Sequence, residues 1–101
     1  RGEAMPYGAS KAALINLTQT IAGSFGGEGI TAVAVAPGWV RTDMSEAFIA
    51  ENGEDAALSG IPIRKMAEPS EIAEIVSFVL RASQSSLSGA VLDVNGASQM
   101  R

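Results

Sequence analysis

The stretch "ITAVAVAPG", residues 30–38, decides the fold. Residues 30–36 are apolar or β-branched without interruption, which predicts a strand of a parallel sheet that is covered on both faces. Pro37 and Gly38 end this strand abruptly. Ligands of open α/β sheets bind beyond the carboxyl ends of the strands, so a binding site is expected near Pro37 and Gly38.

The segment before this strand predicts a helix over residues 10–25. Leu14, Leu17, Ile21 and Phe25 recur at spacings of three and four on one face, and further apolar residues widen this stripe until it covers most of the circumference: Ala12, Ala13, Ile15 and Ala22. Residues 12–27 carry no charge. We therefore expect this helix to be covered on two sides, by the sheet and by something else such as a partner helix; a fully internal or an interfacial helix are the alternatives. The glycines of "GGEG", residues 26–29, end the helix as a turn. A glycine-rich loop that binds phosphate follows a strand, whereas these glycines precede one, so we do not interpret them as a phosphate site.

The segment after the strand predicts two further helices and a second strand. Asp43 or Ser45 is expected to cap a short helix through Ala50, which "ENGED" ends. Pro69 is expected to begin a longer helix, with Arg81 in its last turn. The second strand is "AVLDV", residues 90–94.

The resulting order is helix, strand, short helices, helix, strand, which is typical of an α/β protein with a parallel sheet. Two strands cannot bury both faces of such a sheet. We therefore expect residues 1–101 to be a partial single domain, the C-terminal part of a doubly wound parallel sheet.

The composition excludes several classes of function. Seven Lys and Arg against eleven Asp and Glu give a net charge of −4, which argues against binding nucleic acid or an anionic membrane. The chain has no Cys and no His, so thiolate nucleophiles, imidazole bases and the usual zinc sites are excluded. The acidic residues Glu51, Glu54 and Asp55 are interpreted as a solvated face and not as a metal site. No membrane span or signal pattern is found, so a cytoplasmic location is expected.

Two groups of residues are candidates for chemistry. Tyr7 and Lys11, at positions i and i+4, would lie on one face of a helix, where an ammonium favours the phenolate form of a tyrosine and lets it transfer a proton. A tyrosine on a helix and a solvated lysine are the structural alternative. The segment "WVRTDM", residues 39–44, offers backbone groups at Trp39 and Val40 and the hydroxyl of Thr42 to a carboxamide or phosphate, or is a loop with a helix cap.

Apolar side chains in the same region have two interpretations. Trp39, Met44 and Phe48 would either wall a substrate pocket or pack in the core or a lid.

Four quoted segments, in this order, resemble the short-chain dehydrogenase/reductase family: "YGASKAAL", "GITAVAVAPGWVRTDM", "AEPSEIAEIVSFVL" and "LSGAVLDVNGA". The resemblance implies a Rossmann-type domain that binds NAD or NADP, without distinguishing them, and an oxidoreductase that interconverts a small-molecule alcohol and a carbonyl by hydride transfer.

The resemblance also implies roles for single residues. Tyr7 would be the general acid/base and one of the cofactor-binding residues, and Lys11 would tune it and bind the nicotinamide ribose. Pro37 and Gly38 would shape the loop at the nicotinamide, Val40 would bind the carboxamide through its backbone, and Thr42 would hydrogen-bond the cofactor. The helix at 10–25 would pack against its copy in a homodimer or homotetramer.

Departures from the family pattern leave two hypotheses open. The family's glycine-rich turn, catalytic serine and catalytic asparagine precede the tyrosine, and residues 1–6 hold none of them. Ala97 stands where a second glycine is frequent, which we interpret as a tolerable variation. The chain is either the catalytic C-terminal segment of an NAD(P)-dependent oxidoreductase, or a truncated, inactive remnant that serves as an oligomerisation or interaction module.

Overall fold

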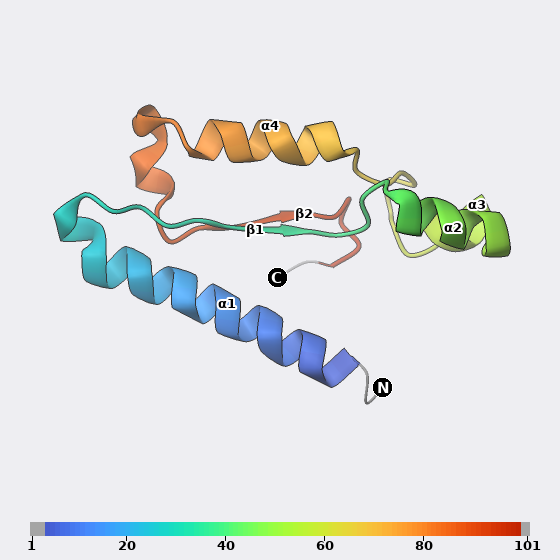
Figure 1. Cartoon of the computed structure of the whole chain (residues 1–101), viewed down its shortest axis with the longest axis horizontal. Coiled ribbons are helices and arrows are strands. Elements are labelled where there is room, and N and C mark those ends of the chain that lie inside the picture. The colour runs from blue at the N-terminus through green and yellow to red at the C-terminus, as the bar shows by residue number, and fades with distance from the viewer. Residues whose placement is uncertain (1–3, 100–101) are drawn as a thin grey trace. The chain divides into compact units, whose positions relative to one another are not determined.

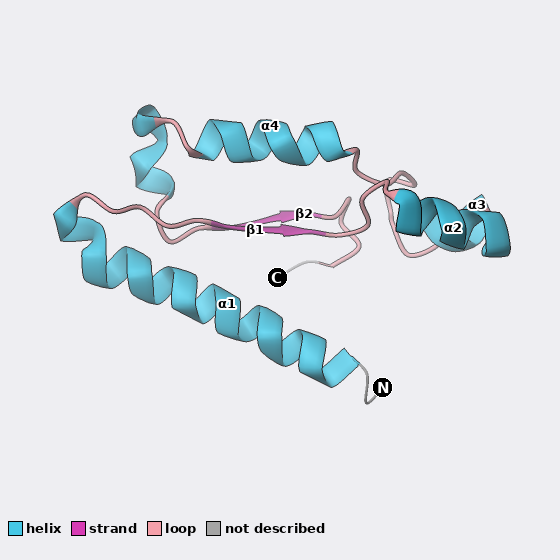
Figure 2. Cartoon of the chain, in the orientation of Figure 1, coloured by secondary structure: helices cyan, strands magenta, loops and turns pink. Residues whose placement is uncertain are grey.

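The computed structural model describes the backbone of residues 4–99 and the side chains of residues 8–99. Its elements are α1 (Ala4–Phe25), the 3₁₀ turn η1 (Gly26–Glu28), β1 (Ala34–Pro37), α2 (Asp43–Asn52), α3 (Glu54–Leu58), α4 (Pro69–Val79), the 3₁₀ segment η2 (Ala82–Leu87) and β2 (Val91–Val94) (Figure 1). The two strands pair in parallel (Figure 2). The predicted order of elements is confirmed.

The chain divides into two compact units. The first comprises Arg1–Ala34 and Val79–Leu92, and the second comprises Val35–Phe78 and Asp93–Arg101. Both strands therefore have residues in each unit.

In the first unit, α1 buries one side of the wide apolar stripe that was predicted. The half-buried or buried residues are Lys11, Ile15, Thr18, Ile21 and Ala22. Thr18 is buried, and its hydroxyl donates a hydrogen bond to the carbonyl of Leu14 at 2.8 Å. Of the predicted apolar face, Ile21 alone is half-buried, while Leu14, Leu17 and Phe25 are exposed. Ile15, Ile21 and Ala22 belong to the predicted wide stripe, so the chain covers one side of that stripe, and the cover expected on its other side is not found among the described residues.

Both strands are shorter than predicted. β1 begins at Ala34 and not at residue 30, and β2 begins at Val91 and not at residue 90. The N–H of Ala32 donates to the hydroxyl of Ser88 at 3.1 Å instead of to a backbone carbonyl, so the regular ladder starts later. Ala34 is buried, but Val35 and Ala36 are half-buried, so the expected cover on both faces is not found among the described residues.

In the second unit, Thr42 caps α2. Its hydroxyl accepts the N–H of Ser45, and the hydroxyl of Ser45 accepts the N–H of Thr42, which together form a capping box. The predicted caps Asp43 and Ser45 are wrong, because both lie inside the helix. The helix continues past Ala50 to Asn52.

A small hydrophobic core holds the second unit together. Ala57, Ile61 and Met66 are buried, and Ile49 and Leu58 pack against them. These five side chains join α2 and α3 to the irregular segment that precedes α4.

The last long helix begins at Pro69 as predicted. The carboxylate of Glu71 accepts the N–H of Glu68 and a hydrogen bond from the Lys65 ammonium, each at 2.9 Å. These two bonds lower the pKa of Glu71. The helix ends at Val79, so the placement of Arg81 in its last turn was wrong; Arg81 has extended backbone angles and precedes η2.

None of the helices within residues 4–99 is both long and apolar enough to cross a membrane.

Gly38 is required by a close approach of two backbone segments. Its N–H donates to the carbonyl of Val94 at 2.9 Å. A Cβ at position 38 would lie 2.6 Å from the Cβ and 3.0 Å from the Cα of Asn95. The end of β1 can therefore lie against the turn after β2 only with glycine at this position.

We predict that Gly38→Ala lowers the free energy of unfolding by roughly 1–3 kcal/mol, because the backbone of Asn95 would have to move. Urea denaturation measures the change. Gly60→Ala is the matched control in the same unit, since a Cβ there meets no atom within 4 Å. Equal effects of the two substitutions would contradict this account.

Ala97 has a φ of 69°, a conformation that residues with a Cβ rarely adopt. It follows Gly96, whose φ is 61°. Ala97 is therefore tolerated in place of the family's glycine, but at the cost of backbone strain that glycine would not have.

We predict that Ala97→Gly raises the free energy of unfolding by about 0.5–1 kcal/mol, the relief of strain less the greater entropy of glycine in the unfolded chain. Ala47→Gly inside α2 is the control and should have the opposite sign, because glycine weakens a helix interior. Urea denaturation of both variants checks the prediction, and destabilisation by both would refute it.

Candidate functional site

A hollow of about 420 Å³ lies beyond the carboxyl end of β1, where a binding site was predicted. It is lined by Gly38, Trp39, Val40, Thr42, Met44, Ser45 and Phe48. None of these side chains is charged. Three of the predicted cofactor-binding residues, Gly38, Val40 and Thr42, therefore line one hollow, while Pro37 precedes it at the end of the strand.

The backbone of Val40 is oriented by its neighbours. The carbonyl of Trp39 accepts the N–H of Ala67 at 3.0 Å, and the N–H of Arg41 donates to the carbonyl of Ala67 at 2.8 Å. Val40 and Ala67 thus form a parallel bridge. Since the residues on either side of Val40 make these bonds, its own N–H and C=O point to the opposite side of the segment.

The hydroxyl of Thr42 caps a helix and can still donate a hydrogen bond. Its hydroxyl oxygen accepts the N–H of Ser45 at 3.4 Å, so the alternative of a loop with a helix cap is correct. A hydroxyl can also donate one hydrogen bond. Within residues 8–99 the structure gives the Thr42 hydroxyl no acceptor, so its proton is available to a ligand.

Apolar side chains form the remaining wall. The rings of Trp39 and Phe48 meet edge to face, with centroids 5.0 Å apart and an interplanar angle of 77°. Met44 is 83% exposed although it belongs to α2, and all three side chains line the hollow. The exposure of Met44 and Trp39 excludes packing in the core, whereas a pocket wall and a lid are both compatible with the structure.

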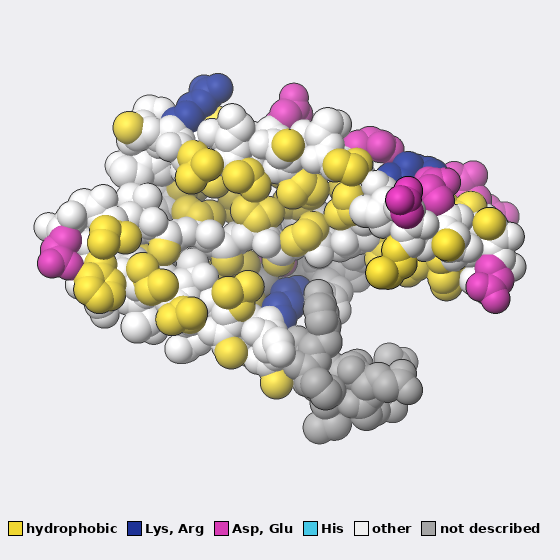
Figure 3. Space-filling view, in the orientation of Figure 1, with side chains coloured by type: hydrophobic (Ala, Val, Ile, Leu, Met, Phe, Trp, Pro, Cys, Tyr) yellow, Lys and Arg dark blue, Asp and Glu magenta, His cyan; other side chains and the backbone are white. Residues whose placement is uncertain are grey.

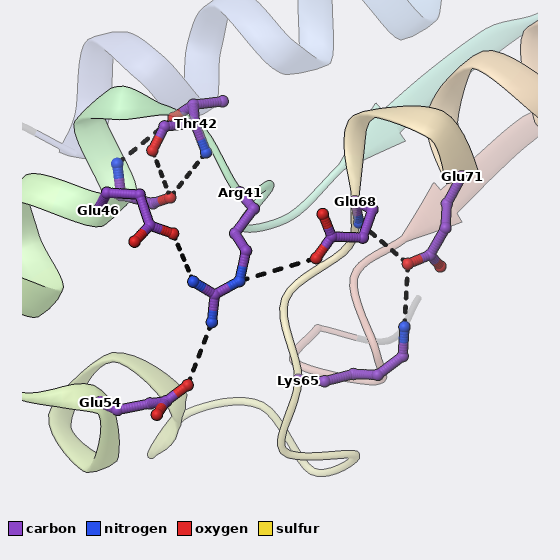
Figure 4. Close-up of polar contacts among 8 residues, drawn as sticks. Arg41, Thr42, Glu46, Glu54, Lys65, Glu68 and Glu71 are labelled. Atoms are coloured by element: carbon purple, nitrogen blue, oxygen red, sulfur yellow. Dashed lines mark hydrogen bonds and ion pairs between the residues drawn. The ribbon is translucent and has the colours of Figure 1, made fainter.

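Arg41, which the sequence analysis did not single out, lies between two residues of the hollow and contacts three carboxylates (Figure 4). Its guanidinium donates to Glu46 in α2 and to Glu54 at the start of α3, the latter at 3.1 Å, and lies 3.7 Å from Glu68. The hydrogen bond to Glu46, followed by the charges of the carboxylates, raises the pKa of Arg41. One feature of the sequence could have pointed to these ion pairs: Arg41 is the one Lys or Arg in residues 12–63, and five acidic residues follow it within residues 43–55.

The other predicted site residues lie in the first unit. Tyr7 and Lys11 are both in α1, one helical turn apart. Lys11 is half-buried, and the side chain of Tyr7 lies outside the described residues. The structure therefore brings together Gly38, Val40 and Thr42 in the second unit and places Tyr7 and Lys11 on one helix in the first.

The acidic residues do not form a metal site in the described part of the chain. No group of three or more Asp or Glu within residues 8–99 is arranged to hold a metal ion. Glu54 pairs with Arg41, and Asp55 lies 3.6 Å from the guanidinium of Arg64.

Comparison with known proteins identifies relatives over almost all of the chain. A family described as enoyl-(acyl carrier protein) reductase matches residues 2–97. The 3-oxoacyl-[acyl-carrier-protein] reductase MabA of Mycobacterium tuberculosis is 39% identical over 94% of this chain and 38% of its own length. The 3-oxoacyl-[acyl-carrier-protein] reductase FabG of Thermotoga maritima is 37% identical over 89% of this chain and 36% of its own length. The 101 residues thus span less than half the length of these relatives.

A solved structure supports the fold. The crystal structure of a short chain dehydrogenase family protein from Francisella tularensis matches 91% of this chain and 42% of that chain, with a TM-score of 0.80 and 24% identity. The predicted α/β fold class, part of a Rossmann-type doubly wound sheet, is confirmed. The chain belongs to the short-chain dehydrogenase/reductase family, as the four sequence segments indicated.

Proposed function

We propose that this chain supplies the proton-transfer helix and the nicotinamide-side wall of an NAD(P)-dependent reductase that interconverts an alcohol and a carbonyl. The observation that carries the proposal is the uncharged hollow beyond β1, which Gly38, Val40 and Thr42 line together. Family membership supports a reductase, and the position of the hollow agrees with ligand binding at strand ends.

The residues of the hollow fit the nicotinamide end of such a cofactor. The N–H and C=O of Val40, which point away from Ala67, would pair with the carboxamide, since an amide needs one acceptor and one donor. The hydroxyl of Thr42 would donate to the cofactor, and Pro37 and Gly38 would shape the loop. NAD or NADP would supply the hydride, and this chain does not distinguish between them.

Tyr7 and Lys11 would handle the proton. Tyr7 would donate a proton to the carbonyl oxygen during reduction and take it back during oxidation. The ammonium of Lys11, one turn along α1, would stabilise the phenolate and bind the nicotinamide ribose. This assignment is carried over from the family motif at positions 7 and 11.

A 3-oxoacyl thioester is the proposed substrate class. The relatives from Mycobacterium tuberculosis and Thermotoga maritima are named as 3-oxoacyl-[acyl-carrier-protein] reductases. Trp39, Met44 and Phe48 give the hollow an apolar wall that suits an acyl chain.

We predict that Tyr7→Phe lowers kcat/KM for reduction of a 3-oxoacyl thioester by about 100-fold or more, because the proton donor is lost. The assay follows nicotinamide absorbance with NADH and with NADPH, in the purified protein together with whatever sequence flanks these residues in its gene. Cofactor binding measured by calorimetry serves as the control for folding and should change little. Unchanged reduction by the variant would refute the role of Tyr7.

A second candidate is an inactive module that mediates oligomerisation, for which the exposed face of α1 offers a surface. Leu14 is 59% exposed and Leu17 is 54% exposed, and hydrophobic side chains lie along α1 in the space-filling view (Figure 3). Exposed apolar patches mark interaction surfaces. A homodimer or homotetramer through α1 is compatible with both candidates, and failure to bind either cofactor would favour the inactive module.

We predict that Leu17→Glu shifts the protein to a smaller oligomer, because a buried unpaired carboxylate is costly. Light scattering coupled to gel filtration measures the mass. Met44→Glu is the control, since Met44 is more exposed and lies on α2. The interface is not at this face of α1 if Leu17→Glu keeps the wild-type mass.

A further inference from the structure

The contacts of Arg41 join three separate segments of the second unit. Arg41 itself lies in the segment between β1 and α2, next to Val40 and Thr42 of the hollow. Glu46 belongs to α2, Glu54 begins α3, and Glu68 directly precedes α4. The side chain of Arg41 therefore contacts α2, α3 and the residue that directly precedes α4.

An arginine is needed for this arrangement. The guanidinium presents five donors in a planar fork, and here Nη1, Nη2 and Nε each face a different carboxylate. A lysine offers one compact ammonium and does not reach three partners in three directions.

The charges make the contact cooperative. Arg41 is 33% exposed and its three partners are each about half exposed, so each pair taken singly is weak. Three carboxylates around one cation form a network with an excess of negative charge. Without the cation, the same carboxylates repel one another and favour separation of α2 and α3.

The segments held in this way include the wall of the hollow. Met44, Ser45 and Phe48 belong to α2. The break at Gly53 between α2 and α3 has a φ of 89°, so the two helices do not continue as one rod. The backbone bridge between Val40 and Ala67 fixes the base of the segment but does not reach α2.

We infer that Arg41 is a positioning residue, which holds α2 and α3 in place through three carboxylates so that the hollow keeps its apolar wall. The consequence for substrate rests on the proposed function, while the positioning of α2 does not. Arg41 itself has no contact with substrate in this inference.

Hydrogen exchange tests the positioning without any assay of activity. In Arg41→Gln, amides of α2 and α3 should exchange about fivefold faster or more, since the loss removes three ion pairs and leaves three repelling carboxylates. Arg41→Lys should restore little of the protection. Arg64→Gln is the matched control, because it removes the same charge from the same unit. Asp55, which is fully exposed, is the one carboxylate of the described residues that Arg64 contacts, so exchange should stay within twofold of the wild type.

A second substitution distinguishes an electrostatic network from simple packing. Glu54→Gln should speed exchange in the wild-type background, because it removes an ion pair. In the Arg41→Gln background, the same substitution should slow exchange, because it relieves repulsion. Acceleration of the same size in both backgrounds, or unchanged exchange in Arg41→Gln, would overturn the inference.

The activity arm separates this inference from the proposed function. With a 3-oxoacyl thioester, Arg41→Gln should raise KM about fivefold while kcat changes less than twofold, because the wall and not the chemistry is altered. If hydrogen exchange changes as expected but the protein reduces no carbonyl, the positioning of α2 is supported and the proposed function is refuted. An active enzyme with unchanged KM in Arg41→Gln would overturn the link between Arg41 and the hollow.

Discussion

The close approach of Gly38 to Asn95 is the constraint on which the candidate site depends. A Cβ at position 38 would lie 2.6 Å from that of Asn95, so the chain leaves β1 in direct contact with the turn after β2. The next residues then form the bridge to Ala67, and Thr42 starts α2. The hollow exists because this short segment is fixed by backbone contacts at one end and by a helix cap at the other.

This construction leaves most side chains of the segment free for other tasks, although that of Thr42 also caps α2. Backbone groups of Gly38, Trp39 and Arg41 make the structural hydrogen bonds, while those of Val40 point to the other side. Trp39 and Thr42 can therefore face a ligand, and Arg41 can reach the carboxylates of three other segments.

Local signals made much of the fold predictable from the sequence. Pro69 begins α4 and Pro37 and Gly38 end β1, because proline and glycine restrict or release the backbone at single positions. The covered face of α1 was not predictable, because Leu14 and Ile15 are equally apolar and the sequence does not say which one the rest of the chain meets. Arg41 escaped notice because its partners follow 5, 13 and 27 residues later in different elements, and ion pairs between elements leave no periodic pattern.

The distribution of charge around the hollow restricts what it can bind. The lining residues carry no charge, and the guanidinium that lies closest in sequence already contacts three carboxylates. The described lining of the hollow offers no free cation to an anion such as a phosphate, so the hollow is better suited to an amide, a carbonyl and an alkyl chain. The donor and acceptor of Val40 and the hydroxyl of Thr42 would orient such a ligand by hydrogen bonds, while the apolar side chains of Trp39, Met44 and Phe48 would pack against it.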